Sequence, residues 1–163
     1  MSRVWAIFFG VGLLPVAPGT WASLVAVGLG VLIYGYLGFF ALLVATIAIT
    51  ALGFWAVGRE LAERHGDDPA EFVIDEVAGQ WIALLFPAAA FWWRGSEGFL
   101  PYPAPLAAFL FFRLFDIWKP WLAGRADARH DAAGVMLDDL WAGLFAGVAV
   151  IVAGIIYHVI LFA

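Results

Sequence analysis

The 163-residue sequence contains no cysteine, which excludes disulfides, thiolate metal sites and catalysis by a cysteine nucleophile. It is also poor in charge, because charged residues make up 13% of the chain, against about 25% in an ordinary soluble domain. Hydrophobic residues make up 65%, which is more apolar surface than a soluble protein of this length could bury. The net charge of -5 and the lack of a basic run argue against a nucleic-acid partner. The composition therefore indicates an integral membrane protein, with residues 1–163 forming a single domain.

The longest stretch without Asp, Glu, Lys or Arg covers residues 4–57. A spanning helix needs about 20 apolar residues, so this stretch must hold more than one element. A Pro/Gly-rich turn interrupts it early, and residues 4–14 are too short to span a bilayer, so we expect an interfacial or re-entrant helix there. Residues 21–57 can form a hairpin of two spanning helices that turns near residues 35–38.

The remainder of the chain predicts three more apolar helices. Asp68 suits the cap position and Pro69 the first turn of the first of these, so we expect it to begin at Asp67-Asp68-Pro69. The expected order is a polar segment (58–71), a helix to about Trp93 with a kink at Pro87, a loop (94–105), a helix (about 106–118), an irregular polar segment (121–134) and a last helix from about 135. The predicted fold is an all-α integral membrane bundle of about four to five membrane helices plus the short N-terminal helix.

Basic residues in short loops predict the orientation of this bundle. Two polar segments, 58–71 and 119–134, hold five of the eight basic residues, whereas the 94–105 loop holds only Arg94. We therefore expect the N-terminus and both polar segments in the cytoplasm, and the 94–105 loop and the C-terminus outside. This threading uses no acidic residue, yet it brings every acidic motif to the same membrane face.

Five carboxylates lie in or beside apolar runs: Asp75, Glu76, Asp116, Asp138 and Asp139. A carboxylate at the bilayer centre costs about 2.5–3.5 kcal/mol on insertion scales, so each of them needs a partner, water or a cation. Acids in a first helical turn are also favoured by the helix dipole, but we expect Asp75 and Glu76 one to two turns into their helix. An alternative function is a small ion or proton transporter, which should place its acids near mid-helix and show internal repeats. These acids lie near helix ends, and no repeat is visible.

Arg113, Asp116 and Lys119 are spaced by three residues, which places Arg113 and Asp116 on one helix face. They could form an intrahelical ion pair with Lys119 reaching to the interface. Alternatively, Asp116 binds a cation while Arg113 and Lys119 bind an anion. For the adjacent pair Asp138 and Asp139, a helix cap is possible, but neighbouring carboxylates repel each other unless a cation neutralises them. Carboxylates without thiolates or paired histidines favour a hard metal such as Mg²⁺.

Gly19 and Thr20 follow a Pro-rich turn and could offer backbone N–H groups and a hydroxyl to an anion, although such turns are common between membrane segments. The three histidines are isolated, and we expect none to bind a metal. Carboxylates, two cations and an N–H-rich turn on one face suit a phosphate bound through a divalent metal. The predicted chemistry is metal-assisted hydrolysis of a phosphomonoester.

Four motifs in this order resemble those of the phosphatidylglycerophosphatase A family. They are Gly12-Leu-Leu-Pro15-x-Ala-Pro18-Gly19-Thr20, Ile74-Asp75-Glu76-Val77-x-Gly79-Gln80, Phe112-Arg113-x-Phe-Asp116-x-x-Lys119-Pro120 and Gly134-Val-Met-x-Asp138-Asp139-x-x-Ala142-Gly143. The resemblance implies a Mg²⁺-dependent enzyme of the bacterial inner membrane. It would convert phosphatidylglycerophosphate to phosphatidylglycerol, with its site at the cytoplasmic face. The chain departs from the family pattern at residues 121–134, where Leu122-Ala123 replaces the usual Pro-Ile.

We expect the five carboxylates to supply the metal ligands and a general base, and a metal-activated water is favoured over an aspartyl nucleophile. The expected phosphate-binding residues are Arg113 and Lys119, helped by Gly19 and Thr20. The expected partners are the phospholipid substrate and the surrounding membrane lipids, and the sequence indicates no particular oligomeric state.

Overall fold

The computed structural model describes residues 1–64, 71–129 and 131–162, and these ranges contain helices and no strand. The elements are α1 (Ser2–Ala6), η1 (Phe8–Leu13), α2 (Pro18–Leu37), α3 (Phe39–Arg64), α4 (Ile74–Trp93), α5 (Ala104–Trp118), α6 (Leu122–Asp127) and α7 (Ala132–Phe162). Four of them, α2, α3, α4 and α7, are long and apolar enough to cross a membrane. The fifth long helix, α5, has 15 residues. The predicted all-α membrane bundle is confirmed.

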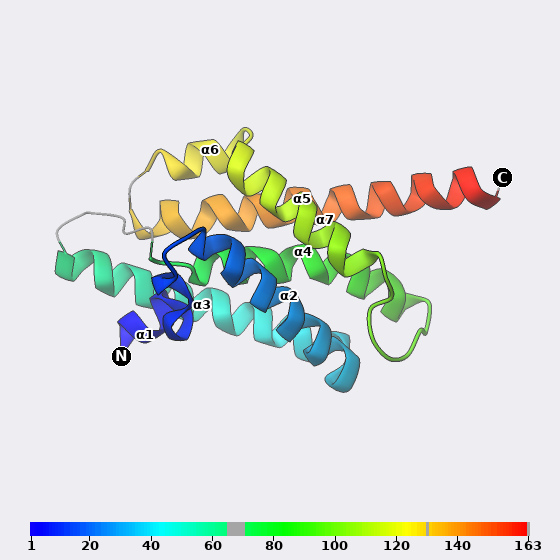
Figure 1. The fold of residues 1–163 in the computed structure, drawn as a ribbon, viewed down its shortest axis with the longest axis horizontal. Coiled ribbons are helices and arrows are strands. Elements are labelled where there is room, and N and C mark those ends of the chain that lie inside the picture. Colours follow the sequence, from blue (N-terminus) through cyan, green and yellow to red (C-terminus); the bar gives the residue numbers. More distant parts are fainter. Residues whose placement is uncertain (65–70, 130, 163) are drawn as a thin grey trace.

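The long helices alternate in direction, so their ends gather at two ends of the molecule (Figure 1). One end holds α1, α6, the starts of α2, α4 and α7, and the end of α5, and we call it the α6 end. The opposite end holds the 94–103 loop and the C-terminus. The hairpin turn predicted near residues 35–38 lies there, where Gly38 adopts a φ of 84° between α2 and α3. A positive φ is costly for residues with a Cβ, which explains a glycine at this turn.

The central helix is α4, which packs against α2, α3, α5 and α7. Over its apolar window it is 61% buried, against 33% or less for the other three spanning helices. Small residues permit this position, since Ala78, Gly79, Ala83 and Ala88 of α4 are all buried. In lipid, where apolar burial alone does not drive helix association, close packing through small residues is what holds helices together.

The closest approach of α4 and α7 is at Gly79 and Gly143. A Cβ on Gly143 would collide with the carbonyl oxygen of Gly79. A Cβ on Gly79 would collide with the carbonyl oxygen of Asp139 and with the ring of Phe112 from α5. Helices α4, α5 and α7 therefore meet at Gly79, where any side chain would collide with its neighbours.

The start of α4 differs from the prediction. The expected start at Asp67-Asp68-Pro69 lies outside the described residues, but α4 begins at Ile74, so Asp75 and Glu76 occupy its first turn. They are not one to two turns into the helix. The cause is a tertiary contact, because the N–H of Val73 donates to the carbonyl of Ala6 at 2.9 Å and ties the residue before α4 to α1.

Two other boundaries also differ. Residues 58–64 continue α3 instead of forming a polar loop, and Ser2 Oγ donates to the buried Glu60 carboxylate there at 2.6 Å, which joins α1 to α3. The segment 121–134, predicted to be irregular, contains α6 and the first turn of α7. The predicted stop of α5 at Lys119 is confirmed, since Lys119 takes a left-handed conformation with a φ of 48°.

Replacing Gly143 with alanine should separate α4 from α7. We expect Gly143→Ala to lower the free energy of unfolding in detergent by about 1–3 kcal/mol, since overpacking in a tight contact costs this much. The matched control is Gly28→Ala in α2, where a Cβ would meet no atom within 4 Å. Equal stability of the two variants would show that α4 and α7 are not in tight contact at this glycine.

Candidate functional site

The predicted site residues converge on the α6 end of the bundle. Asp75 and Glu76 lie in the first turn of α4, and Asp138 and Asp139 lie in the second turn of α7. Asp116 lies in the last turn of α5, which runs the opposite way and ends there. Three helices, α2, α4 and α7, point their N-termini at this region. A helix N-terminus carries partial positive charge, which favours carboxylates at this end.

A trio of carboxylates forms the centre of the cluster. Oxygen atoms of Asp75, Glu76 and Asp139 all lie within 4.8 Å of one another. Asp75 is only 8% and Asp139 only 3% exposed, so water cannot fully solvate them. The Oε2 atom of Glu76 is buried and has no hydrogen-bond partner within residues 1–64, 71–129 and 131–162. Carboxylates this close repel one another unless protons or a cation neutralise them, and oxygen-only ligands suit a hard divalent cation. The trio could therefore hold a metal ion.

Asp138 points its carboxylate to a lysine. Its Oδ2 accepts a hydrogen bond from Lys119 Nζ at 2.7 Å, and its Oδ1 accepts one from the N–H of Asp139 at 2.8 Å. Lys119 also pairs with Asp127 of α6. Burial lowers the pKa of Lys119, but its hydrogen bonds to Asp127 and Asp138 raise the pKa by more, so the net shift is upward. Lys119 therefore keeps its positive charge beside the trio.

Arg113 and Asp116 form the predicted ion pair along α5, through Nη1 of the arginine and Oδ2 of the aspartate. The same Nη1 lies 3.5 Å from Ser23 Oγ of α2. The Nε of Arg113 is buried and has no partner among the described residues. The carboxylate of Asp116 repels those of Asp139 and Glu76 when all three are ionised. The arginine thus has a buried N–H donor on a side chain that lies near Glu76 of the trio, where a low dielectric strengthens any charge-assisted hydrogen bond.

Gly19 is at the site because it lacks a side chain. A Cβ there would collide with Glu76 Oε1 and would lie 3.4 Å from Arg113 Nη1. The start of α2 can therefore lie directly against both residues. Thr20 occupies the same turn, but its N–H donates to the carbonyl of Ala17 at 3.0 Å and is not free to bind an anion. The contribution expected from the Thr20 N–H is not supported in this conformation, and that of its hydroxyl stays a prediction.

Gln80 was not among the predicted site residues. It is fully buried, one helical turn after Glu76, and neither the nitrogen nor the oxygen of its side-chain amide has a hydrogen-bond partner in the described part of the chain. Buried amides without a partner are costly and rare, so Gln80 is a further candidate for the site. The only signal in the sequence is its spacing of four residues from Glu76 within one motif, which places both on one face of α4.

The start of α7, which carries Asp138 and Asp139, is fixed by Asp131. Its Oδ1 accepts the N–H of Gly134 at 2.6 Å, the bond of a helix N-cap. Arg129 Nη2 lies 2.9 Å from the same carboxylate. The hydrogen bond from Arg129, with that from Gly134, lowers the pKa of Asp131. Asp131 belongs to residues 121–134, the segment that departs from the family pattern. Its cap nevertheless defines where α7 begins.

The arrangement is that of a membrane-embedded enzyme acting on a phosphate ester, because a possible metal site, a buried arginine donor and a charged lysine meet at the end of a transmembrane bundle. A sequence model of the phosphatidylglycerophosphatase A family matches residues 4–154. The chain belongs to this family, and it is therefore a phosphatase. No solved structure matches the chain.

Curated relatives cover most of the chain. A Bacteroides thetaiotaomicron protein with the provisional name phosphatidylinositol-3-phosphatase is 37% identical over 89% of this chain and 88% of its own length. A Haemophilus influenzae phosphatidylglycerophosphatase A is 34% identical over 89% of this chain and 83% of its own length. An Escherichia coli phosphatidylglycerophosphatase A is 32% identical over 98% of this chain and 85% of its own length.

Removing the cap at Asp131 should loosen the start of α7. We expect Asp131→Ala to speed hydrogen exchange at the amides of Gly134 and Val135 several-fold at neutral pH, whereas Asp131→Asn, whose side chain also caps helices, should keep most of the protection. Because folding lowers the pKa of Asp131, its stabilisation is present above the unfolded-state pKa and is lost as pH falls through the folded value. Protection factors measured by mass spectrometry between neutral and acidic pH check both effects. Identical protection in the alanine variant would contradict the capping role.

Proposed function

We propose that the chain hydrolyses the terminal phosphomonoester of phosphatidylglycerophosphate, releasing phosphate and phosphatidylglycerol, with Mg²⁺ as cofactor. The observation that carries the proposal is that Glu76, a member of the acidic trio with Asp75 and Asp139, and Arg113 both lie against Gly19 of α2. Arg113 there keeps a buried donor without a partner in the described part of the chain. Membership of the phosphatase family and the two relatives named phosphatidylglycerophosphatase A support the choice of substrate. A lipid phosphate also suits the position of the site at an end of the bundle, where a headgroup meets water while its acyl chains stay in the bilayer.

The trio fits a divalent cation. Its ligands are carboxylate oxygens, and the buried Oε2 of Glu76 has no partner within the described part of the chain. We assign Asp75, Glu76 and Asp139 as the ligands, because Asp116 and Asp138 direct their carboxylates to Arg113 and Lys119 instead. When bound, the cation would polarise the phosphoryl group and lower the pKa of a water molecule.

The two basic residues bind the phosphate in this proposal. Arg113 offers Nε, and its ion pair with Asp116 fixes the plane of the guanidinium. Lys119 adds a point charge, which Asp138 and Asp127 hold near the trio. Both cations stabilise the charge that develops on the phosphoryl oxygens in the transition state.

The reaction requires one proton to leave the attacking water and one to reach the leaving oxygen. A carboxylate of the cluster accepts the first proton as the water oxygen bonds to phosphorus. The bond between phosphorus and the glycerol oxygen breaks, and that oxygen takes up a proton to become the alcohol of phosphatidylglycerol. Burial of the cluster limits access of bulk water and keeps the charge interactions strong.

The protein is a membrane protein, and we propose the bacterial inner membrane with the α6 end at the cytoplasmic face. Most basic residues support this orientation, since they lie at or near that end, while Arg94 lies at the other. The basic residues at the α6 end are Arg3, Arg59, Arg64, Lys119, Arg125 and Arg129. Phosphatidylglycerophosphate would then be reached from the cytoplasmic leaflet.

Purified protein should release phosphate from phosphatidylglycerophosphate with Mg²⁺ and lose this activity with a chelator. We expect Asp139→Asn and Asp116→Asn each to lower kcat by about 10²-fold or more, as loss of a preorganised charge does, while both variants stay folded. The control is Glu97→Gln, an exposed acid in the loop at the opposite end, which should keep the wild-type rate. A phosphatidylinositol 3-phosphate arm tests the other name found among the relatives, and a higher kcat/KM for that lipid would overturn the substrate assignment.

The absence of cysteine allows a direct test of orientation. We expect a single cysteine at Ser96, exposed in the 94–103 loop, to react with a membrane-impermeant thiol reagent on intact cells. A cysteine at Ala128, exposed between α6 and α7, should react only after the cells are opened. The reverse pattern would place the α6 end outside.

A further inference from the structure

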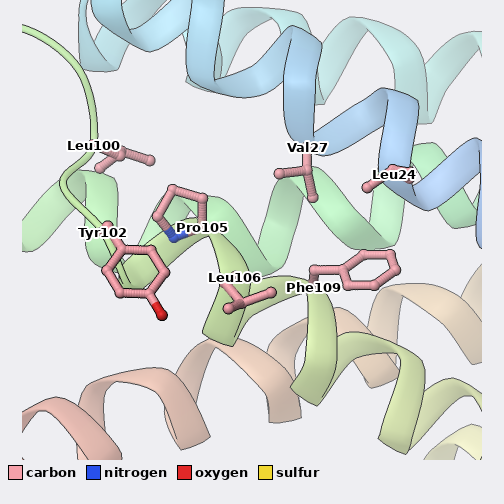
Figure 2. Close-up of a pocket in the computed structure, with 7 residues that line it drawn as sticks. All are labelled: Leu24, Val27, Leu100, Tyr102, Pro105, Leu106 and Phe109. Carbon is pink, nitrogen blue, oxygen red and sulfur yellow. The ribbon is translucent and has the colours of Figure 1, made fainter.

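An apolar groove lies between α2 and α5, away from the charged cluster. Figure 2 shows Leu24 and Val27 of α2 pointing toward Leu106 and Phe109 of α5, with Leu100 and Tyr102 closing one end. Its volume is about 320 Å³, and its lining is almost entirely hydrocarbon. The volume is at the lower end of the range of about 300–1,000 Å³ typical of small-ligand sites.

The groove lies along the same pair of helices as the contact between Arg113 and Ser23 at the phosphatase site. Leu24 follows Ser23, whose hydroxyl lies 3.5 Å from Arg113 Nη1, so this contact closes the seam between α2 and α5 at the α6 end. Phe109 lies one helical turn before Arg113 on α5. A ligand whose phosphate is bound by Arg113 would therefore reach Phe109 first and the rest of the groove after it.

The groove lies at the distance from Arg113 where the acyl chains of the substrate begin. Leu106 is seven positions before Arg113, which at a rise of 1.5 Å per residue is about 10 Å along α5. A glycerol, a phosphodiester and a second glycerol separate the terminal phosphate of phosphatidylglycerophosphate from its acyl chains and bridge this stretch. The loop residues Leu100 and Tyr102 line the groove beyond Pro105 (Figure 2), and their loop lies at the end of the bundle opposite α6 (Figure 1).

We propose that this groove binds an acyl chain of the substrate lipid and so distinguishes long-chain lipid phosphates from their headgroups alone. The inference rests on the proposed function, because it requires a lipid phosphate at Arg113. The acyl chain is in hydrocarbon before and after binding, so its gain comes from packing contacts with the groove wall and not from removal from water. The groove thus holds the substrate in register while the charged cluster acts on its phosphate. Bulk lipid would lack the phosphomonoester that holds the headgroup at Arg113.

The first test measures chain-length selectivity in the full-length protein. Val27→Trp should fill the groove and lower the ratio of kcat/KM for long-chain over short-chain phosphatidylglycerophosphate by about tenfold, chiefly through KM. Leu106→Trp should do the same from the α5 wall. The matched control is Val44→Trp on the exposed face of α3, which should leave the ratio unchanged. An unchanged ratio in both groove variants would overturn the proposal.

The second test uses only wild-type protein and does not require turnover of the substrate. Wild-type protein in nanodiscs with a chelator is irradiated with phosphatidylglycerophosphate that carries a diazirine on one acyl chain, and the labelled peptides are mapped. We expect labelling of residues 100–109 well above that by phosphatidylcholine with the same diazirine chain. Equal labelling by the two lipids would mean that the groove holds only bulk lipid. Selective labelling, together with no phosphate release in the separate assay with Mg²⁺, would reject the proposed reaction but keep the groove as a lipid-phosphate site.

Discussion

The contact between α4 and α7 determines the geometry of the site. Gly79 and Gly143 have no side chains, so the two helices approach until backbone meets backbone. This approach places the first turn of α4 beside Asp139 on α7, which is why the carboxylates of Asp75, Glu76 and Asp139 lie within 4.8 Å. Phe112 of α5 packs against Gly79. This contact also positions its neighbour Arg113. One packing contact thus sets residues from three helices.

Electrostatic repulsion opposes this packing. Five carboxylates meet only two basic side chains at the centre of the site, so the cluster carries an excess of negative charge when all are ionised. The N-termini of α2, α4 and α7 offset part of it. The remainder favours a cation at the trio in the proposed function, while the buried donor of Arg113 is left for an anion. The protein uses packing energy to hold charges that would separate if the helices were free to move.

Much of this arrangement could be predicted from local sequence patterns. Long runs without charge predicted the spanning helices, glycine predicted the turn at Gly38, and the Lys-Pro pair predicted the end of α5. Basic residues in loops predicted that the acids would converge, although the acids were not used. These features depend on neighbours in the chain or on the membrane, so the sequence carries them directly.

The rest depends on contacts between distant residues. The start of α4 follows from the bond between Val73 and Ala6, and α6 lies where Lys119 can reach Asp127. Neither contact leaves a periodic signal. Gln80 could not be recognised as an unpaired polar group, because its neighbours in the sequence do not reveal whether its amide has a partner. The trio proposed as ligands could not be distinguished from Asp116 and Asp138, since that distinction depends on which carboxylates pair with Arg113 and Lys119.

The late position of α7 in the chain has a consequence for biosynthesis. Synthesis proceeds from the N-terminus, so Asp75 and Glu76 enter the membrane region before Asp138 and Asp139 exist. Because α4 begins at Ile74, these two acids are at the helix end, where water at the membrane surface can solvate them until α7 arrives. A chain that stops before residue 132 contains α1 to α6 but lacks α7 and Asp139. Insertion of the last helix is therefore the step that brings Asp139 to Asp75 and Glu76 and completes the acidic trio.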